Sequence, residues 1–273
     1  MVVKFSAAKE RCTMLSSQPP KPEALTVVMP ARDEEACVGR QVAALLGIDA
    51  LGDLATVRVI VVDNGSTDGT AREAALAGAQ VVSEPRRGYG AACLAGVLAA
   101  PAGDIILLMD ADGSDDPAAT ALVLAPLMRG DADLAMGSRV RGTVEPGALD
   151  PRQRAGNAVA TVMLRLLYGV RVSDVGPMRA IRREALMALG MQEMTYGWST
   201  EMLVKAGRTG YRIVEVPVGY RRRAGGRSKV SGTIRGSVGA GISMLGTILR
   251  YVRWRPSSPE GVPAWLVNPA DVG

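Results

Sequence analysis

The sequence predicts an α/β protein: a mostly parallel sheet flanked by helices, in a single domain. Short apolar runs rich in β-branched residues alternate with segments that carry apolar residues at helical spacing, which is typical of strand–helix–strand units. Polar clusters follow the ends of several runs, where parallel sheets bind their ligands. The length of 273 residues suits one such domain with a tail.

The first half of the chain supplies these elements in order. Apolar runs predict strands over 25–29, 57–62, 80–83, 105–109 and 133–136. Helical spacing predicts helices over 34–46, 67–77, 89–100 and 117–128. Pro117 stands at the first position of the last helix, where its missing N–H is not needed. Two further helices are expected, one opening at 196–201 and one over 236–249.

Both ends of the chain are expected to lie outside the core. Residues 1–23 have no apolar run of signal-peptide length and end in a proline-rich stretch, which predicts a flexible leader. Residues 236–249 are uncharged but shorter than a membrane-spanning helix. For the C-terminal helix and tail, 234–273, two interpretations stay open: a buried helix, or an interfacial helix on a membrane surface with its flanking arginines at the headgroups.

Composition excludes several classes of chemistry. The chain has no histidine, which rules out His-based triads, His-ligated zinc and imidazole acid–base catalysis. A metal would be held mainly by oxygen, which favours Mg²⁺ or Mn²⁺. The three cysteines are scattered, so neither a disulfide framework nor a zinc site is expected, and the predicted location is cytoplasmic.

The charge is unevenly distributed along the chain. The net charge is +5, yet residues 203–255 hold twelve Lys or Arg against one acid, Glu215. A basic C-terminal third beside an acidic body indicates an anionic ligand or a membrane surface contacted from one side. Aromatic residues make up only 4% and no nucleic-acid module is recognisable, so no nucleic-acid partner is expected.

The densest acidic cluster directly follows the strongest strand. Asp110, Asp112, Asp115 and Asp116 repel one another unless a cation or hydrogen-bond donors offset their charge. Asp110 and Asp112 are two residues apart, so we expect both to point at the ligand crevice and to hold a divalent ion that also binds a diphosphate. For Asp115 and Asp116, capping of the following helix is the alternative.

Three other segments are candidates for ligand binding. Asp63 ends the second strand and could accept from a ribose hydroxyl or a base N–H, with a purely structural turn as the alternative. Gly88 and Gly90 match only part of a dinucleotide fingerprint. Residues 220–229 contain five cations and two glycines, which predicts either a loop for phosphate oxygens or a solvated basic loop.

Together, in-order motifs over residues 25–233 resemble the family 2 nucleotide-sugar glycosyltransferases, in the branch of polyprenyl-phosphate mannosyl- and glucosyltransferases. The motifs are Pro30-Ala-Arg-Asp-Glu-Glu35, Val62-Asp-Asn-Gly-Ser-Thr-Asp-Gly69, Gly88-Tyr-Gly90, Asp110-Ala-Asp-Gly113, Gly137-Ser-Arg139, Arg182-Arg-Glu184 and Arg223-Ala-Gly-Gly-Arg-Ser-Lys229. The resemblance implies a GT-A domain over 24–233, with a nucleotide-binding part at about 24–115 and an acceptor part at about 116–233. It also implies inverting transfer of a hexose from a UDP- or GDP-hexose to a polyprenyl phosphate.

The same resemblance implies roles for individual residues. It places a divalent ion on Asp110 and Asp112, with Ser114 close to it. Contacts to the donor nucleotide and its diphosphate are implied for Pro30, Arg32, Glu34, Asp63, Gly88, Asp110, Ala111, Arg223, Ser228 and Lys229. The residues implied in catalysis are Asp112, Arg139, Asp174 and Glu201. Arg139 would contact a phosphate of the donor or acceptor, and Asp174 or Glu201 would be the base that a hydroxyl acceptor needs.

The chain departs from the family pattern in three places. Asp33 stands where Asn is usual, residues 174–179 form a shorter stretch than usual, and the C-terminal spanning helices of many relatives do not occur. Three alternatives therefore stay open: a soluble enzyme of this family with a small hydroxyl acceptor, a sugar nucleotidyltransferase, and a non-catalytic nucleotide-sugar-binding module. With a lipid acceptor, we expect the protein at the inner face of the membrane as a peripheral protein.

Overall fold

A computed structural model describes residues 24–48, 54, 56–223, 225 and 234–256. Its strands are β1 (Leu25–Ala31), β2 (Val57–Asp63), β3 (Gln80–Ser83), β4 (Ile105–Leu108), β5 (Leu134–Ser138), β6 (Arg179–Arg182) and β7 (Ile213–Pro217). Its helices are α1 (Val38–Leu46), α2 (Thr70–Leu76), α3 (Tyr89–Ala99), α4 (Thr120–Met128), α5 (Pro151–Tyr168), α6 (Arg183–Ala188), α7 (Trp198–Thr209) and α8 (Ile234–Arg250), with short 3₁₀ turns at Pro117–Ala119 and Tyr251–Arg253. The predicted leader, Ser228, Lys229 and the tail from residue 257 lie outside the described residues.

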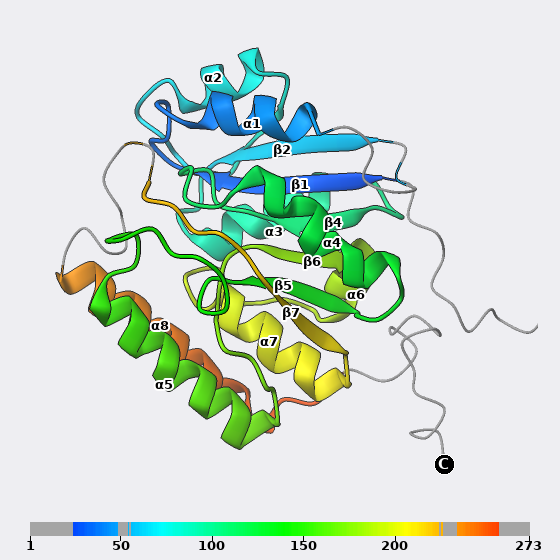
Figure 1. Cartoon of the computed structure of the whole chain (residues 1–273), viewed down its shortest axis with the longest axis vertical. Helices are drawn as coiled ribbons and strands as arrows, with labels where there is room; N and C mark the ends of the chain where they lie inside the picture. The colour runs from blue at the N-terminus through cyan, green and yellow to red at the C-terminus, as the bar shows by residue number, and fades with distance from the viewer. Residues whose placement is uncertain (1–23, 49–53, 55, 224, 226–233, 257–273) are drawn as a thin grey trace, which may run out of the picture.

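The described strands form one sheet in the order β3-β2-β1-β4-β6-β5-β7 (Figure 1). β3, β2, β1 and β4 pair in parallel, and β5 pairs in parallel with β7, whereas β6 runs antiparallel to both β4 and β5. The prediction of a mostly parallel sheet is therefore confirmed. The chain steps outward from β1 to β3 and returns to β4 on the other side of β1. The carboxyl ends of β1 and β4 thus flank a switch point, where open α/β sheets bind ligands.

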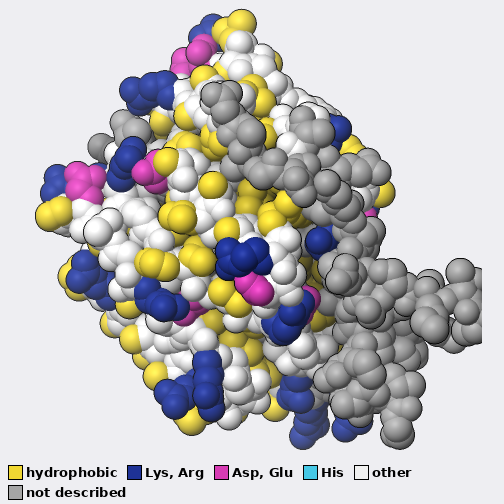
Figure 2. Space-filling view, turned by 45° about the vertical axis from the view of Figure 1, so that its right-hand side comes forward, with side chains coloured by type: hydrophobic (Ala, Val, Ile, Leu, Met, Phe, Trp, Pro, Cys, Tyr) yellow, Lys and Arg dark blue, Asp and Glu magenta, His cyan; other side chains and the backbone are white. Residues whose placement is uncertain are grey.

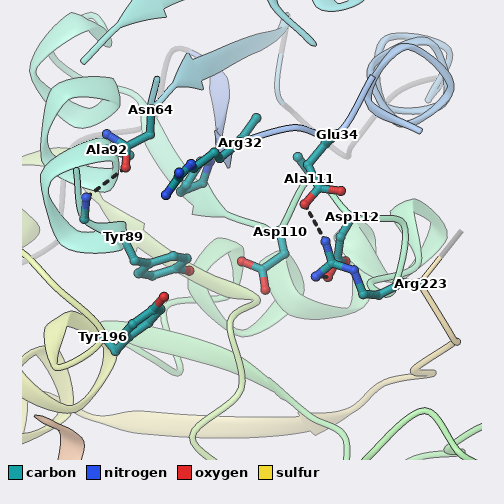
Figure 3. Close-up of a pocket in the computed structure, with 13 residues that line it drawn as sticks. Arg32, Glu34, Asn64, Tyr89, Ala92, Asp110, Ala111, Asp112, Tyr196 and Arg223 are labelled. Atoms are coloured by element: carbon teal, nitrogen blue, oxygen red, sulfur yellow. Dashed lines mark hydrogen bonds and ion pairs between the residues drawn. The ribbon is translucent and has the colours of Figure 1, made fainter. Parts of the chain in front are cut away.

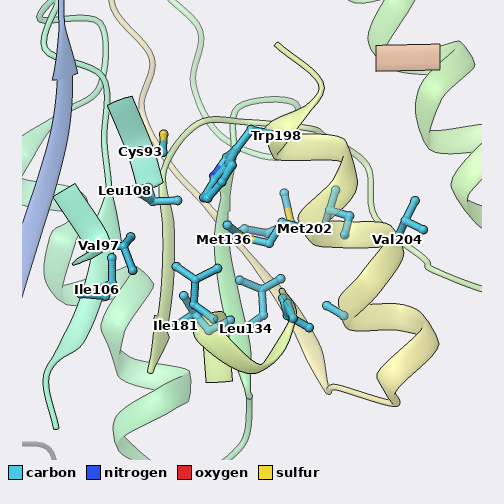
Figure 4. Close-up of a cluster of buried hydrophobic side chains, with 14 of the residues drawn as sticks. Cys93, Val97, Ile106, Leu108, Leu134, Met136, Ile181, Trp198, Met202 and Val204 are labelled. Atoms are coloured by element: carbon cyan, nitrogen blue, oxygen red, sulfur yellow. The ribbon is translucent and has the colours of Figure 1, made fainter. Parts of the chain in front are cut away.

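Each face of the sheet carries its own hydrophobic core, because successive side chains of a strand point to opposite faces. On β1, Val28 packs into a core with α3 and α7, while Val27 and Met29 pack into a second core with α1 and α4. Trp198, the first residue of α7, is fully buried in the first core (Figure 4). The two cores together fix the sheet between its helices.

Several predicted boundaries differ by a few residues, because two loops at the carboxyl edge bind each other. The expected helices over 34–46 and 67–77 begin only at Val38 and Thr70. The backbone N–H of Glu34 donates to Thr70 Oγ1 at 2.8 Å, and the N–H of Thr67 donates to Asp33 Oδ1 at 2.8 Å. If the helices began earlier, these backbone N–H groups would point along the helix axis and could not reach the other loop. The hydrogen bonds instead hold the two loops together at the carboxyl edge of the sheet.

Four elements were not predicted: α5, β6, α6 and β7. The ends of α5 nevertheless carry clear signals, since Asp150 forms a capping box with Gln153 and Gly169 ends the helix in the left-handed conformation. Its interior mixes arginine, glycine and asparagine with apolar residues, which blurs the helical period. β6 has only four residues, two of them arginine, and its fully buried position depends on its neighbours β4 and β5.

The predicted C-terminal helix exists as α8 and lies beside α5 at one end of the molecule (Figure 1). Thr247 and Ile248 are buried, while the side chains of Ile242 and Leu249 are 67% and 59% exposed. One side of the helix therefore packs on the protein and another faces solvent, so the helix is only partly buried, and its contact with a membrane stays a prediction. Within the described residues, no helix has the length and apolar character needed to cross a bilayer.

Candidate active site

An acidic pocket opens at the carboxyl ends of β1, β2 and β4 (Figure 3). Residues after each strand contribute to its wall, which explains how segments far apart in the chain meet at one place. Glu34 follows β1, Asn64 follows β2, and Asp110 and Asp112 follow β4. The full lining is Pro30, Ala31, Arg32, Glu34, Asn64, Gly88, Tyr89, Ala92, Asp110, Ala111, Asp112, Tyr196 and Arg223.

Arg223 closes one side of the acidic pocket by bridging two carboxylates. Its guanidinium lies 2.7 Å from Asp112 Oδ2 and also forms an ion pair with Glu34. The Arg223 side chain is 26% exposed and comes from the segment after β7, more than a hundred residues beyond Asp112. Of the residues predicted in the basic loop, Arg223 therefore lies at the acidic pocket, where its cation offsets acidic charge.

The carboxylates after β4 lie close enough to perturb one another. Burial, together with the charges of Asp112 and Asp115, raises the pKa of Asp110 well above its usual range. Burial and the charge of Asp112 raise the pKa of Asp115 to about 7. Such mutual repulsion is what a bound cation relieves. Asp116, by contrast, caps the 3₁₀ turn that precedes α4, as one of the alternatives for it predicted.

The donor atoms in this cluster fit a divalent ion. Asp110 and Asp112 both line the pocket, and Ser114 Oγ donates to Asp112 Oδ1 at 2.5 Å. Among the described residues, no group of three or more His, Cys, Asp or Glu side chains is arranged to hold a metal by itself. A site with two carboxylates matches the habit of Mg²⁺, which completes its shell with water and substrate phosphates.

The turn after β2 carries two polar residues, Asp63 and Asn64, and only Asn64 lines the pocket. Asp63 Oδ1 accepts from the N–H of Ser66 at 3.1 Å, so Asp63 holds the turn and is not part of the pocket wall. Asn64, which was not singled out, lines the pocket. Its amide donates to the carbonyls of Glu84 and Arg86 and accepts from the N–H of Gly88 at 2.8 Å. Asn64 therefore fixes the glycine turn that forms the next part of the wall.

A second, apolar pocket lies between this site and the helix pair α5 and α8. Its lining combines apolar groups, among them Val175, Pro177, Met244 and Leu245, with the charged side chains Asp110, Arg139 and Arg152. The acidic and apolar pockets share Tyr89, Asp110 and Tyr196. An elongated apolar ligand with an anionic end would match this distribution of groups.

Arg139, one of the charged residues that line the apolar pocket, is held in place by Asp174. Its Nε and Nη2 donate to the two oxygens of Asp174, both at 2.8 Å. The central carbon of the guanidinium also lies 5.0 Å from the centre of the Tyr220 ring. Burial lowers the pKa of the Arg139 guanidinium, but the hydrogen bonds and charge of Asp174 outweigh burial and raise it. Burial likewise raises the pKa of Asp174, yet Arg139 holds it below its usual value. Arg139 is therefore a fixed cation and Asp174 a poor base.

Glu201 does not reach either of these pockets, contrary to its predicted place near the sugar. Its carboxylate is fully buried, pairs with Lys205 at 2.7 Å, and accepts the backbone N–H groups of Gln192 and Glu193. Lys205, equally buried, also donates to the carbonyl of Gly190. The pair holds the loop before α7 in place. Glu201 therefore has a structural role here, in place of the predicted role as a base near the sugar.

The acidic pocket thus gathers most of the predicted donor contacts. Those it brings together are Pro30, Arg32, Glu34, Gly88, Asp110, Ala111 and Arg223, and Asp112, predicted as a metal ligand, lies with them. Tyr89 and Tyr196 also line the pocket but were not predicted as site residues, although both stand in segments expected to begin helices. Only the fold reveals that they share a wall.

A mostly parallel sheet with paired carboxylates after a central strand, at a topological switch point, is the arrangement of the GT-A glycosyltransferases. The comparisons agree: residues 26–190 match the family described as Glycosyl transferase family 2, and the chain belongs to that family. It is 44% identical over 218 residues to an uncharacterized glycosyltransferase of Mycobacterium tuberculosis, covering 79% of this chain and 94% of the relative. The protein is therefore a glycosyltransferase, and the predicted family and enzyme class are confirmed.

Other relatives and a solved structure place the chain within the family. A dolichyl-phosphate hexose transferase of Haloferax volcanii is 35% identical over 202 residues, covering 74% of this chain and 84% of that protein. A polyprenol monophosphomannose synthase of Mycolicibacterium smegmatis is 36% identical over 192 residues, covering 65% and 71%. Glucosyl-3-phosphoglycerate synthase from Mycobacterium tuberculosis, solved with Mn²⁺, UDP and phosphoglyceric acid, superposes with a TM-score of 0.67 at 24% identity, covering 86% and 80%. That likeness confirms the GT-A fold.

Proposed function

We propose that this enzyme transfers a hexose from a UDP- or GDP-hexose to a polyprenyl phosphate, with inversion and with the help of Mg²⁺ or Mn²⁺. The observation that carries the proposal is the meeting of an acidic pocket and an apolar pocket at Asp110, with the cation of Arg139 in the lining of the apolar one. The names of two relatives support it, since the Haloferax protein is a dolichyl-phosphate hexose transferase and the Mycolicibacterium protein a polyprenol monophosphomannose synthase.

In the proposed reaction, an oxygen of the acceptor phosphate attacks the anomeric carbon as the bond from that carbon to the diphosphate breaks. The nucleoside diphosphate leaves with the bonding electrons. A divalent ion on Asp110 and Asp112 would offset charge on the diphosphate. Arg223 lies at the same pocket and supplies a second positive charge for the leaving group. Arg139, fixed by Asp174, orients the anionic end of the acceptor.

The state of the two candidate bases favours a phosphate acceptor over a hydroxyl. A hydroxyl must lose a proton during attack, whereas a phosphate monoester is already anionic near neutral pH. Asp174 is committed to Arg139, and Glu201 is committed to Lys205 and two backbone N–H groups. Neither side chain is therefore placed to take the proton that a hydroxyl acceptor would release.

A transfer assay tests the proposal directly. Radiolabelled UDP- and GDP-hexoses are incubated with the enzyme and Mn²⁺, with and without a polyprenyl phosphate. We expect label in an acid-labile lipid fraction only when the lipid phosphate is present. Transfer confined to soluble hydroxyl acceptors would contradict the proposal, and pyrophosphate release from a sugar phosphate and a nucleoside triphosphate would indicate a nucleotidyltransferase.

The pair of Asp174 and Arg139 gives a prediction about the acceptor. Asp174→Asn removes the charge that fixes Arg139, and hydrogen bonds to charged groups are worth about 1.5–3 kcal/mol. We expect the KM for the lipid phosphate to rise about 10-fold or more, with the KM for the nucleotide sugar changed less than about 3-fold. Glu145→Gln, at an exposed pair with Arg222, serves as the control. Equal changes in both KM values would place Arg139 on the donor.

We also propose that the faces of α5 and α8 turned to solvent rest on a membrane. Val159, Val162 and Leu166 are exposed at spacings that share one face of α5, and Ile242 and Leu249 lie two turns apart on α8. Amphipathic helices of this kind bury their apolar faces at the headgroup boundary. In the view of Figure 2, basic side chains are spread among hydrophobic and acidic ones.

Vesicle flotation checks this surface. We expect the protein to float with vesicles of anionic lipid, less at high salt, and Leu166→Gln with Ile242→Gln to reduce the floating fraction severalfold. The control is Leu76→Gln, because Leu76 is 75% exposed on α2 at the opposite end of the molecule (Figure 1). Flotation that the paired variant does not change would rule out this face as the contact.

A further inference from the structure

The wall shared by the two pockets is made of two tyrosines and one carboxylate. Tyr89, Asp110 and Tyr196 each line both the acidic and the apolar pocket. Figure 3 shows the two phenol rings side by side, with their hydroxyl groups on the side of Asp110. Any group that passes from a ligand in one pocket to a ligand in the other must cross this wall.

The two tyrosines are brought together by unusually close backbone packing. Gly88 and Gly90 flank Tyr89 at the start of α3, and the N–H of Gly90 donates to the carbonyl of Thr195 at 3.2 Å. A Cβ on Gly90 would lie 2.2 Å from the carbonyl oxygen of Glu193, so only glycine allows the loop before α7 to approach this far. Tyr196, at the end of that loop, is thereby placed against α3.

The loop that carries Tyr196 is also tied to helix α8. Glu193 accepts from the N–H and the hydroxyl of Thr195, at 3.1 and 2.6 Å. Its other oxygen accepts from Arg250 at 3.1 Å. Tyr196 itself is 39% exposed, while Tyr89 packs partly buried against the core beside α3. Tyr89 thus lies on a packed helix, while Tyr196 presents a face and a hydroxyl on a firmly held loop.

This combination of groups suits a hexose ring. A pyranose has apolar C–H faces and a polar rim of hydroxyls, and tyrosine offers an apolar body with a polar tip. A carboxylate beside the rings accepts hydrogen bonds from sugar hydroxyls. We infer that Tyr89, Tyr196 and Asp110 form the subsite for the hexose being transferred, with Tyr196 as the ring that covers it. The inference rests on the proposed function and adds the residues that hold the sugar.

The location of the subsite agrees with the reaction. In the proposed reaction, the anomeric carbon must lie between the diphosphate, in the acidic pocket, and the attacking phosphate, which Arg139 would hold in the apolar pocket. The shared wall is where the two pockets meet in the described part of the chain. A sugar held there is positioned for in-line attack, which is a large source of rate enhancement in bimolecular reactions.

Binding measurements separate the sugar from the nucleotide. Calorimetry in the presence of Mn²⁺ compares UDP-glucose with UDP, and GDP-mannose with GDP, for the wild type and three variants. Tyr196→Ala is expected to weaken the binding of the nucleotide sugar about 10-fold while the affinity for the nucleoside diphosphate changes less than about 2-fold. Tyr196→Phe, which keeps the ring, should retain most of the affinity for the nucleotide sugar. Tyr168→Phe is the control, because Tyr168 lines neither pocket.

The outcomes distinguish this inference from the proposed function. A wild type that binds a nucleotide sugar and transfers its hexose, with a Tyr196→Ala variant that loses affinity for sugar and nucleotide equally or for neither, would overturn the subsite and leave the function standing. A wild type that binds no nucleotide sugar would overturn both. Circular dichroism confirms that each variant is folded, which the partial exposure of Tyr196 leads us to expect.

Discussion

Asp112→Asn is expected to reduce the metal-dependent kcat/KM by about 100- to 1,000-fold, the range seen when one group that stabilises transition-state charge is removed. Asn keeps the shape of the side chain, so Ser114 can still donate to it, but it lacks the charge that a divalent ion and Arg223 both require. The measurement is steady-state transfer at several Mn²⁺ concentrations. Binding of Mn²⁺ followed by electron paramagnetic resonance should weaken in parallel.

The control for this prediction lies in the same loop. Asp116 caps a 3₁₀ turn and pairs with Arg221 at 2.7 Å, outside both pockets. Asp116→Asn keeps a good capping residue, so turnover and Mn²⁺ binding should stay within about 2-fold of the wild type. If Asp112→Asn bound Mn²⁺ and turned over like the wild type, the assignment of the metal site would be wrong.

Glu201→Gln is expected to destabilise the fold by about 3–5 kcal/mol, because it leaves the buried cation of Lys205 without its charged partner. The two side chains are completely buried, so water cannot replace the lost interaction. Chemical denaturation monitored by tryptophan fluorescence measures the loss, and Trp198, buried at the start of α7, reports on the region. Adding Lys205→Met to Glu201→Gln should recover part of the stability, since it removes the unpaired charge while the Gln amide oxygen can still accept from the backbone N–H groups of Gln192 and Glu193.

The Glu201→Gln variant also distinguishes a structural role of Glu201 from a catalytic one. At a temperature where Glu201→Gln is folded, a positioning role in the loop before α7 predicts a pH–rate profile of unchanged shape and a fall in kcat/KM of only a few-fold. Full stability combined with loss of kcat would instead restore the role of a catalytic base, which the sequence alone suggested. Stability and pH profile together therefore distinguish the two roles.

Much of the candidate site followed from local sequence patterns. The paired carboxylates Asp110 and Asp112 come directly after a buried apolar strand, and parallel strands bring their carboxyl ends to one edge. That rule needs only the position of each strand along the chain. Glu34 and Gly88 were implied by the family resemblance, through the short motifs in which they stand, and both line the acidic pocket.

Other roles depended on contacts between distant segments. The sequence by itself determined the alternation of strands and helices up to β5, the gathering of acidic residues at the carboxyl ends of the strands, and, in a chain without histidine, the expectation that a metal would be held by oxygen. Only the tertiary structure decided that β6 runs antiparallel, that α5 pairs with α8, that Glu201 is held by Lys205, and that Tyr196 meets Tyr89. The physical reason is that periodicity and capping act within a few residues, whereas these partners are chosen by packing and charge compensation in the folded core, which leave no local pattern.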